Sequence, residues 1–171
     1  MIKVDCKELE DLKKRIDDLN SEDFTKDFTN EAGQRLYGKV VQRTPVGQKP
    51  SFEQFATGRK SLAKQKADYD SYWQGYVGGT LRKAWKLNPA KKTGNGYEIT
   101  VENPMEYASF VEFGHKQKVG RYVPQINKKL VHGWVDGQFF LKKSEIELIR
   151  ELPTVFNRKI KQVLNEAIND K

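Results

Sequence analysis

The sequence is poor in the residues that build covalent cross-links and membrane spans. Its one cysteine, Cys6, allows no intrachain disulfide and no cysteine-based metal site, and it favours a reducing, intracellular setting. There is no run of about 18 apolar residues, so no segment is predicted to cross a membrane. The polar start, followed by acidic residues, is also unlike a signal peptide.

Motifs for catalysis are missing too. The chain has no glycine-rich phosphate loop, no Gly-x-Ser-x-Gly elbow and no His-Glu-x-x-His pair. The two histidines, His115 and His132, could face each other near Glu112, but two nitrogens and one oxygen make a weak metal site. His132 and Asp136 have no nucleophile beside them. We therefore expect no catalytic residue, cofactor or metal, and a small hydrolase or toxin is a minor alternative.

What the sequence does have is positive charge. The 171 residues carry a net charge of +8, 32% of them are charged, and aromatic residues at 11% must supply much of a lean core. An excess of this size suggests an acidic partner, either DNA or a carboxylate-rich protein surface. The simpler alternative is a domain with many solvated lysines.

Helices are predicted in the first quarter of the chain. Apolar residues at spacings of three and four predict one helix over Lys7–Leu19 and a second over about Glu22–Arg43, with Ser21 as its N-cap. Gly33 and Gly38 could mark close packing of the second helix against a sheet. Thr44-Pro45 should end that helix, because the residue before a proline avoids helical geometry.

Residues 46–78 form a polar segment with scattered aromatics, longer than an ordinary loop. A short helix is expected near Ser61–Ala67. Two interpretations remain open: a mobile arm that reaches a neighbouring subunit, and an ordered insertion folded onto its own domain. We treat residues 1–171 as a single domain with this inserted arm.

A sheet is predicted after the arm. Residues alternate with period two over Leu81–Leu87 and over Tyr97–Val101, on either side of the turn Gly94-Asn95-Gly96, which is typical of a hairpin. Its basic and acidic outer faces should oppose each other. Asn103-Pro104 should stop the second strand. Residues 107–113 should form a helical turn that leads into a strand and ends at Gly114.

Residues 114–133 contain many cations and no acidic residue. We expect a long, flexible basic hairpin that would attract phosphates or suit an acidic protein groove, although a solvated loop is the plain alternative. After it, a helix is predicted over about Lys142–Leu152 with Ile146, Ile149 and Leu152 inward, and another from Pro153. The fold class is thus α+β: a small antiparallel sheet with a long basic hairpin, covered by N-terminal and C-terminal helices.

The order of these pieces resembles a known family. The most specific run is Glu106-Tyr107-Ala108-Ser109-Phe110-Val111-Glu112-Phe113-Gly114-His115, and Arg43-Thr44-Pro45-Val46, Gly79-Thr80-Leu81-Arg82 and Gly137-Gln138-Phe139-Phe140-Leu141 agree with it. The chain resembles the minor tail-component family of tailed double-stranded DNA phages and prophages, whose members are similar to tail-completion and tail-terminator (neck) proteins.

The resemblance implies a structural protein of a phage or phage-like particle, without cofactors, that forms a ring at the tail end or neck. Its partners would be copies of itself, with a hexamer expected, together with tail tube or sheath proteins, neck proteins and DNA in the channel. It would assemble in the host cytoplasm and remain in the tail particle. The alternative is a stand-alone nucleic-acid-binding domain. The residues expected to face a subunit or DNA are Arg82, Lys83, Lys86, His115, Lys116, Lys118, Arg121, Lys128 and Lys129.

Overall fold

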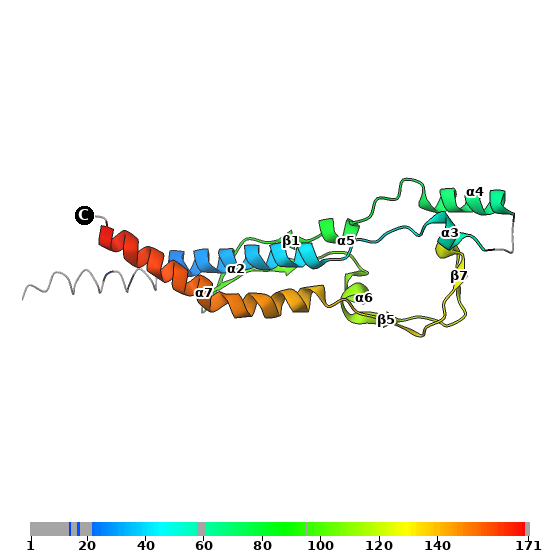
Figure 1. Ribbon diagram of the computed structural model, residues 1–171. Helices are drawn as coiled ribbons and strands as arrows, with labels where there is room; N and C mark the ends of the chain where they lie inside the picture. Colours follow the sequence, from blue (N-terminus) through cyan, green and yellow to red (C-terminus); the bar gives the residue numbers. More distant parts are fainter. Residues whose placement is uncertain (1–13, 15–16, 18–21, 58–60, 95, 170–171) are drawn as a thin grey trace, which may run out of the picture. The chain divides into compact units, whose positions relative to one another are not determined.

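The structure is a computed structural model, and it describes residues 14, 17, 22–57, 61–94 and 96–169. The helix predicted over Lys7–Leu19 lies outside these residues, apart from Lys14 and Asp17, which are helical, and so does the predicted N-cap Ser21. Helices dominate the described chain, and its strands pair antiparallel (Figure 1). The predicted α+β class is confirmed.

The described residues divide into two compact units, which we treat separately. Unit 1 takes in the described parts of Met1–Val40, Lys86–Glu102 and Lys142–Lys171, and unit 2 takes in those of Val41–Trp85 and Asn103–Leu141. Within the described residues, no helix combines the length and the apolar character that a membrane crossing needs.

In unit 1 a hairpin packs on a long helix. Strand β1 (Lys86–Leu87) pairs with β4 (Val101–Glu102), and β2 (Lys91–Thr93) pairs with β3 (Gly96–Glu98). The register sets Lys86 opposite Glu102 and Lys91 opposite Glu98, so the predicted opposition of basic and acidic faces is confirmed. The second strand stops before Asn103-Pro104, also as predicted.

Helix α2 (Glu22–Arg43) has the predicted bounds and ends before Thr44-Pro45. Gly33 is buried, and a Cβ there would overlap the side chain of Ile99 in the hairpin. Close packing is therefore confirmed at Gly33. At Gly38 the prediction is wrong, because a Cβ there would meet nothing within 4 Å.

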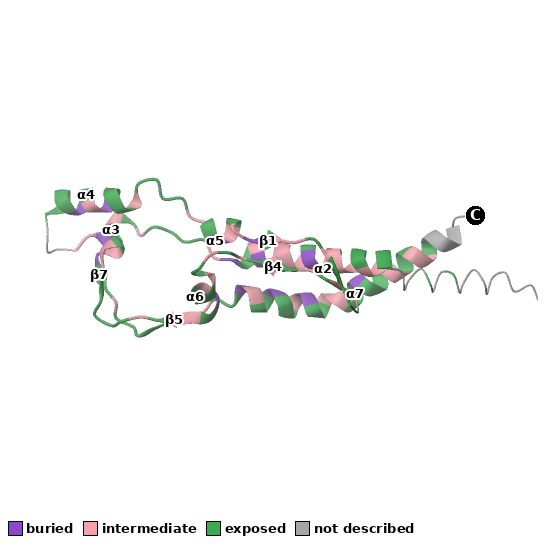
Figure 2. Ribbon diagram, turned by 180° about the vertical axis from the view of Figure 1, so that it is seen from behind, coloured by how far each residue is buried: buried purple, intermediate pink, exposed green. Residues whose placement is uncertain are grey.

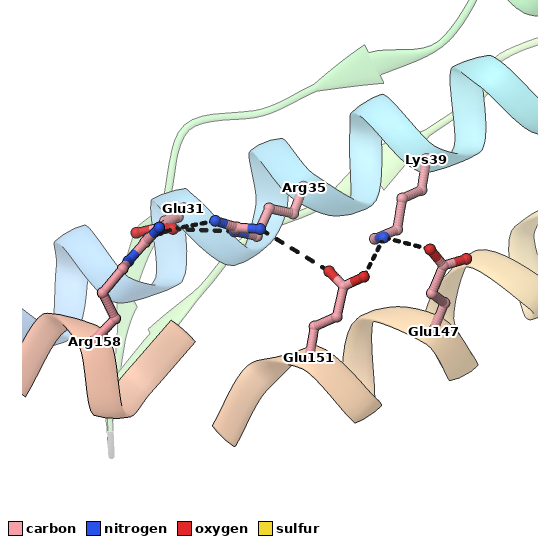
Figure 3. A network of polar contacts seen from close by, with 6 residues as sticks. All are labelled: Glu31, Arg35, Lys39, Glu147, Glu151 and Arg158. Atoms are coloured by element: carbon pink, nitrogen blue, oxygen red, sulfur yellow. Dashed lines mark hydrogen bonds and ion pairs between the residues drawn. The ribbon is translucent and has the colours of Figure 1, made fainter. Parts of the chain in front are cut away.

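Helix α7 (Phe140–Asn169) runs antiparallel to α2, and apolar and ionic contacts join the two. The ring of Phe156 meets Phe24 and Phe28 edge-on, at centroid distances of 5.9 and 5.4 Å. Lys39 Nζ lies 2.7 Å from a carboxylate oxygen of Glu147 and 2.7 Å from one of Glu151 (Figure 3). Hydrogen bonds to these two carboxylates raise the pKa of Lys39.

A second ionic group surrounds Glu31 on α2. Arg35 donates to its carboxylate at 2.9 Å, Arg158 of α7 also donates to it, and Lys159 Nζ lies at 3.5 Å (Figure 3 draws Arg35 and Arg158). Partial burial alone would raise the pKa of Glu31. The hydrogen bonds from Arg35 and Arg158 outweigh that effect, so this pKa lies below its usual value.

The two helices predicted over 142–152 and from Pro153 are one helix. Pro153 lies inside α7, where its missing N–H and its ring disturb the helix without ending it, and Figure 1 shows α7 changing direction along its length. The predicted inward positions were wrong for Ile146 and Ile149, which are 43% and 64% exposed. The buried positions follow a different phase, and they are Phe140, Ser144, Leu148 and Val155.

In unit 2 the strand predicted over Leu81–Leu87 begins instead as helix α5 (Thr80–Lys83). Leu81 and Trp85 are both buried while Lys83 between them is exposed, which is the spacing of a helical turn and not of a strand. Gly79 caps this helix with a φ of +94°, in the left-handed region that glycine tolerates. Only Lys86–Leu87 remains extended.

The predicted helical turn and strand around Gly114 are confirmed as helix α6 (Ala108–Phe113) and strand β5 (Gly114–Lys116). Strand β5 opens the long basic hairpin, where it pairs with β8 (Trp134–Asp136). Farther out, β6 (Tyr122–Val123) pairs with β7 (Lys128–Lys129), and the short 3-10 helix η1 (Pro124–Ile126) turns the tip. The long hairpin is therefore confirmed.

Candidate interaction surface

Two helices form within the predicted arm because serines cap them. Ser51 and Gln54 make a reciprocal capping box at the start of α3 (Phe52–Phe55). Ser61 Oγ accepts from the backbone N–H of Lys64 at the start of α4 (Leu62–Trp73), so the helix expected near Ser61–Ala67 is confirmed and extends farther. Tyr69 of α4 packs edge-on against Phe52 and Phe55 and joins the two helices.

Asn127 ties these arm helices to the tip of the basic hairpin. Its backbone is left-handed with a φ of +52°, and the residue is 8% exposed. Its Nδ2 donates to the carbonyl of Phe55 at 3.1 Å and to Gln65 Oε1 at 3.5 Å, while its Oδ1 accepts from the hydroxyl of Tyr122 at 2.6 Å. Because every one of these groups is linked to another, the arm and the tip share one buried polar network.

The indole of Trp73 adds a second link, since Nε1 donates to the carbonyl of Gln125 at 2.9 Å. Figure 1 shows α3 and α4 beside β7, and Figure 2 shows the buried residues of α4 on its side toward α3. We call residues 49–55, which include α3, together with α4 and residues 118–130 the head. The insertion and the hairpin tip, about 60 residues apart in sequence, are thus one packed body.

Five of the predicted contact residues come together on the exposed hairpin (Figure 2). They are Lys116, Lys118, Arg121, Lys128 and Lys129. The pairing sets Tyr122 opposite Lys129 and Val123 opposite Lys128. Since neighbouring residues in a strand point to opposite faces, Lys128 and Lys129 lie on opposite faces of the hairpin.

The other predicted contacts do not belong to this exposed group on the hairpin. Lys83 is exposed but lies on α5, and Lys86 is exposed but belongs to unit 1. His115 is half-buried in β5, opposite Val135, with its Nδ1 buried and without a hydrogen-bond partner. His132 does not lie opposite His115. The register sets His115 opposite Val135, and the backbone N–H of Gln117 donates to the carbonyl of Gly133.

Arg82 has a structural role that was not predicted from its charge. Its Nε and Nη2 donate to the carbonyl of Thr44 at 2.9 and 2.6 Å, just beyond the end of α2. Trp85 Nε1 donates to the hydroxyl of the same threonine at 2.7 Å. The guanidinium therefore satisfies a carbonyl at a helix C-terminus, where a cation is favoured.

Glu112 was also missed as a structural residue. It is buried, and its Oε2 accepts from the backbone N–H of Leu141 at 3.0 Å, in the first turn of α7. The main chain of residues 111–112 accepts two more bonds, from the N–H groups of Gln138 and Phe139. The Glu-Phe-Gly-His and Gly-Gln-Phe-Phe-Leu runs therefore contact each other.

Unit 2 also exposes apolar side chains. Phe110 and Phe113 on α6 are 55% and 60% exposed, and Trp134 on β8 is 49% exposed. A groove of about 390 Å³ opens nearby, lined among others by Val46, Tyr76 and Tyr107. Exposed aromatic side chains in one region are typical of protein contact surfaces.

The described residues offer no group of three histidine, cysteine or acidic side chains that could hold a metal ion. The positive charge, in contrast, is unevenly shared. The sequence ranges of unit 2 contain 13 lysines and arginines against 6 acidic residues, while those of unit 1 contain 18 against 17. Nearly all of the net charge therefore belongs to unit 2.

These features can now be set beside known proteins. A family model described as "Bacteriophage HK97-gp10, putative tail-component" matches residues 7–114. No similar curated protein and no similar solved structure was found. The match spans more than half of the chain, so the chain belongs to the HK97-gp10-like family of phage tail components. Its role is that of a structural phage protein associated with the virion.

Proposed function

We propose that this protein is a non-enzymatic subunit that completes the tail or joins head to tail, by forming a ring at the tail end or neck. The family match over residues 7–114 carries this proposal. The exposed aromatics of α6 and β8 support it, because a ring needs apolar surface between copies. Tail tube or sheath proteins and neck proteins would be its further partners, and assembly would take place in the host cytoplasm.

The basic hairpin is the part of this subunit that we expect to dock. Its cations are exposed, and residues 114–133 contain no acidic residue that could pair with them internally. An assembled particle brings such a surface against either a neighbouring subunit or DNA. Removing the charge should then interrupt assembly at the step in which this protein joins.

The test is complementation of particles that lack this protein. The variant Lys116→Glu, Lys118→Glu, Arg121→Glu should leave tails incomplete or heads unjoined, as seen by electron microscopy and by the yield of infectious or complete particles. The control variant Lys26→Glu, Arg150→Glu, Lys161→Glu changes three exposed cations of unit 1 by the same total charge and should assemble normally. Normal particles from the hairpin variant would contradict the proposal.

A further inference from the structure

The excess charge of unit 2 is not matched by an opposite net charge anywhere else in the chain. A neighbouring copy offers unit 1, whose sequence ranges are nearly neutral, or unit 2, which is itself positive. Bringing several such units together in an assembly concentrates like charge, which is unfavourable without counter-charge. A different, strongly anionic partner would supply this counter-charge.

The geometry of the head indicates what kind of anion fits. Lys129 and Tyr122 lie on one face of the hairpin, and Lys128 lies on the other. Arg121 is exposed and comes directly before β6, where its carbonyl accepts a hydrogen bond from the backbone N–H of Leu130. A folded acidic protein would have to set carboxylates against both faces at once, whereas an extended polyanion can follow cations around an edge.

The arm adds cations to the same body. Lys64 on α4 is exposed, as is Lys49 before α3. Lys49 has its Nζ atom 5.9 Å from the centre of the Tyr69 ring, which holds this charge near the head surface, whereas Lys66 forms an ion pair with Asp70 at 2.8 Å. The network around Asn127 holds the arm helices and the hairpin tip together. Little conformational freedom is therefore lost when a ligand binds.

We propose that the head binds the phosphate backbone of a nucleic acid without reading its base sequence. The cations involved are Arg121, Lys128 and Lys129 of the hairpin tip, with Lys49 and Lys64 of the arm. Lysine and arginine side chains contact phosphates in this way, and the released counterions supply the affinity. The inference rests on the proposed function in that a tail-end or neck subunit would meet the genome.

The test is fluorescence anisotropy of the full chain with a labelled DNA duplex of roughly 20 base pairs, titrated at several salt concentrations between about 50 and 200 mM. We expect binding to weaken steeply with salt. The head variant Arg121→Glu, Lys128→Glu, Lys129→Glu should reduce the slope of log K against log salt by about 3, since each lost phosphate contact removes about 0.9. Scrambling the duplex sequence should change nothing.

The control is the unit 1 variant Lys26→Glu, Arg150→Glu, Lys161→Glu, which has the same net charge as the head variant and should keep most of the affinity. Equal losses in both variants would show attraction by net charge alone and overturn the proposal. Equal competition by polyglutamate, per charge, would assign an acidic protein instead and also overturn it. The proposed function is tested separately, because a head variant that assembles rings but does not bind DNA leaves it standing.

Discussion

At the scale of single residues, Asn127 decides whether the arm and the hairpin tip form one body. We predict that Asn127→Ala loosens the head. The substitution removes the amide that donates to Phe55 and Gln65, and it places alanine at a φ of +52°, a left-handed conformation that asparagine tolerates better. Leaving buried polar groups unpaired costs about 1–3 kcal/mol, which corresponds to amide exchange faster by roughly five- to 150-fold in α3 and α4.

Hydrogen exchange of the α3 and α4 amides, followed by mass spectrometry, measures this loss. Gln125→Ala is the matched control, since the tip uses only the backbone carbonyl of Gln125 and its side chain is exposed. Asn127→Gly should give an intermediate exchange rate, because glycine adopts the left-handed backbone easily but lacks the side-chain amide. Unchanged exchange in Asn127→Ala would mean that the arm is held by its apolar contacts alone.

Some residue roles could be predicted from the sequence and others could not. Gly33 was predicted correctly because a glycine on the apolar side of a helix has few reasons to be there other than close packing. Arg82 and Glu112 were not, because a charged side chain in sequence gives no sign that its partner is a backbone group of a distant helix. The left-handed backbone at Asn127 has a weak signal, since asparagine tolerates that region.

At the scale of elements, the contact between α2 and α7 should respond to acid through Glu31. Its folded pKa is lowered, so its contribution to stability is present above the unfolded value of 4.5 and is lost as the pH falls through the folded pKa. We predict that Glu31→Gln lowers the free energy of unfolding by about 1–2 kcal/mol at pH 7. The gap to the wild type should then close below pH 4.5.

Thermal or urea unfolding at a series of pH values measures this gap. Glu145→Gln removes the same charge from an exposed position on α7 and should show a small difference at every pH. A gap for Glu31→Gln that stays constant as the pH is lowered through and beyond the folded pKa of Glu31 would mean that the effect comes from packing and not from the charge.

Elements were predictable where local signals agreed. Helix α2 has its predicted extent, because clear periodicity and the following Thr44-Pro45 mark its end. The predicted hairpin forms, but only Lys86–Leu87 of its first predicted strand is extended. Helix α5 was misread, because four residues fit a period of two and a helical turn equally well, and the burial of Trp85 against Phe140 selects the turn. Pro153 was misread as a start because tertiary packing carries α7 past it.

At the scale of the whole molecule, the total charge can be read from the sequence, but its distribution between the two units cannot. The ranges of the two units interleave along the chain, so no window of sequence shows that the excess belongs to one of them. The arm and the hairpin are likewise separate in sequence, and only the fold unites their cations in the head. The basic hairpin could thus be predicted as a candidate surface from the sequence. That the arm contributes cations to the same surface could not be predicted.

This division of charge makes a prediction about self-association. Copies that meet with their positive units nearby repel each other over the screening distance, which falls from about 10 Å at 0.1 M salt to about 3 Å at 1 M. We therefore expect the isolated protein to self-associate more strongly as salt rises, as measured by sedimentation velocity. The head variant Arg121→Glu, Lys128→Glu, Lys129→Glu should associate at low salt already, because six of the seven excess charges of unit 2 are removed. Oligomers of the wild type that dissociate as salt rises would show that ion pairs join the copies, and would place the basic hairpin against a neighbouring subunit instead of a nucleic acid.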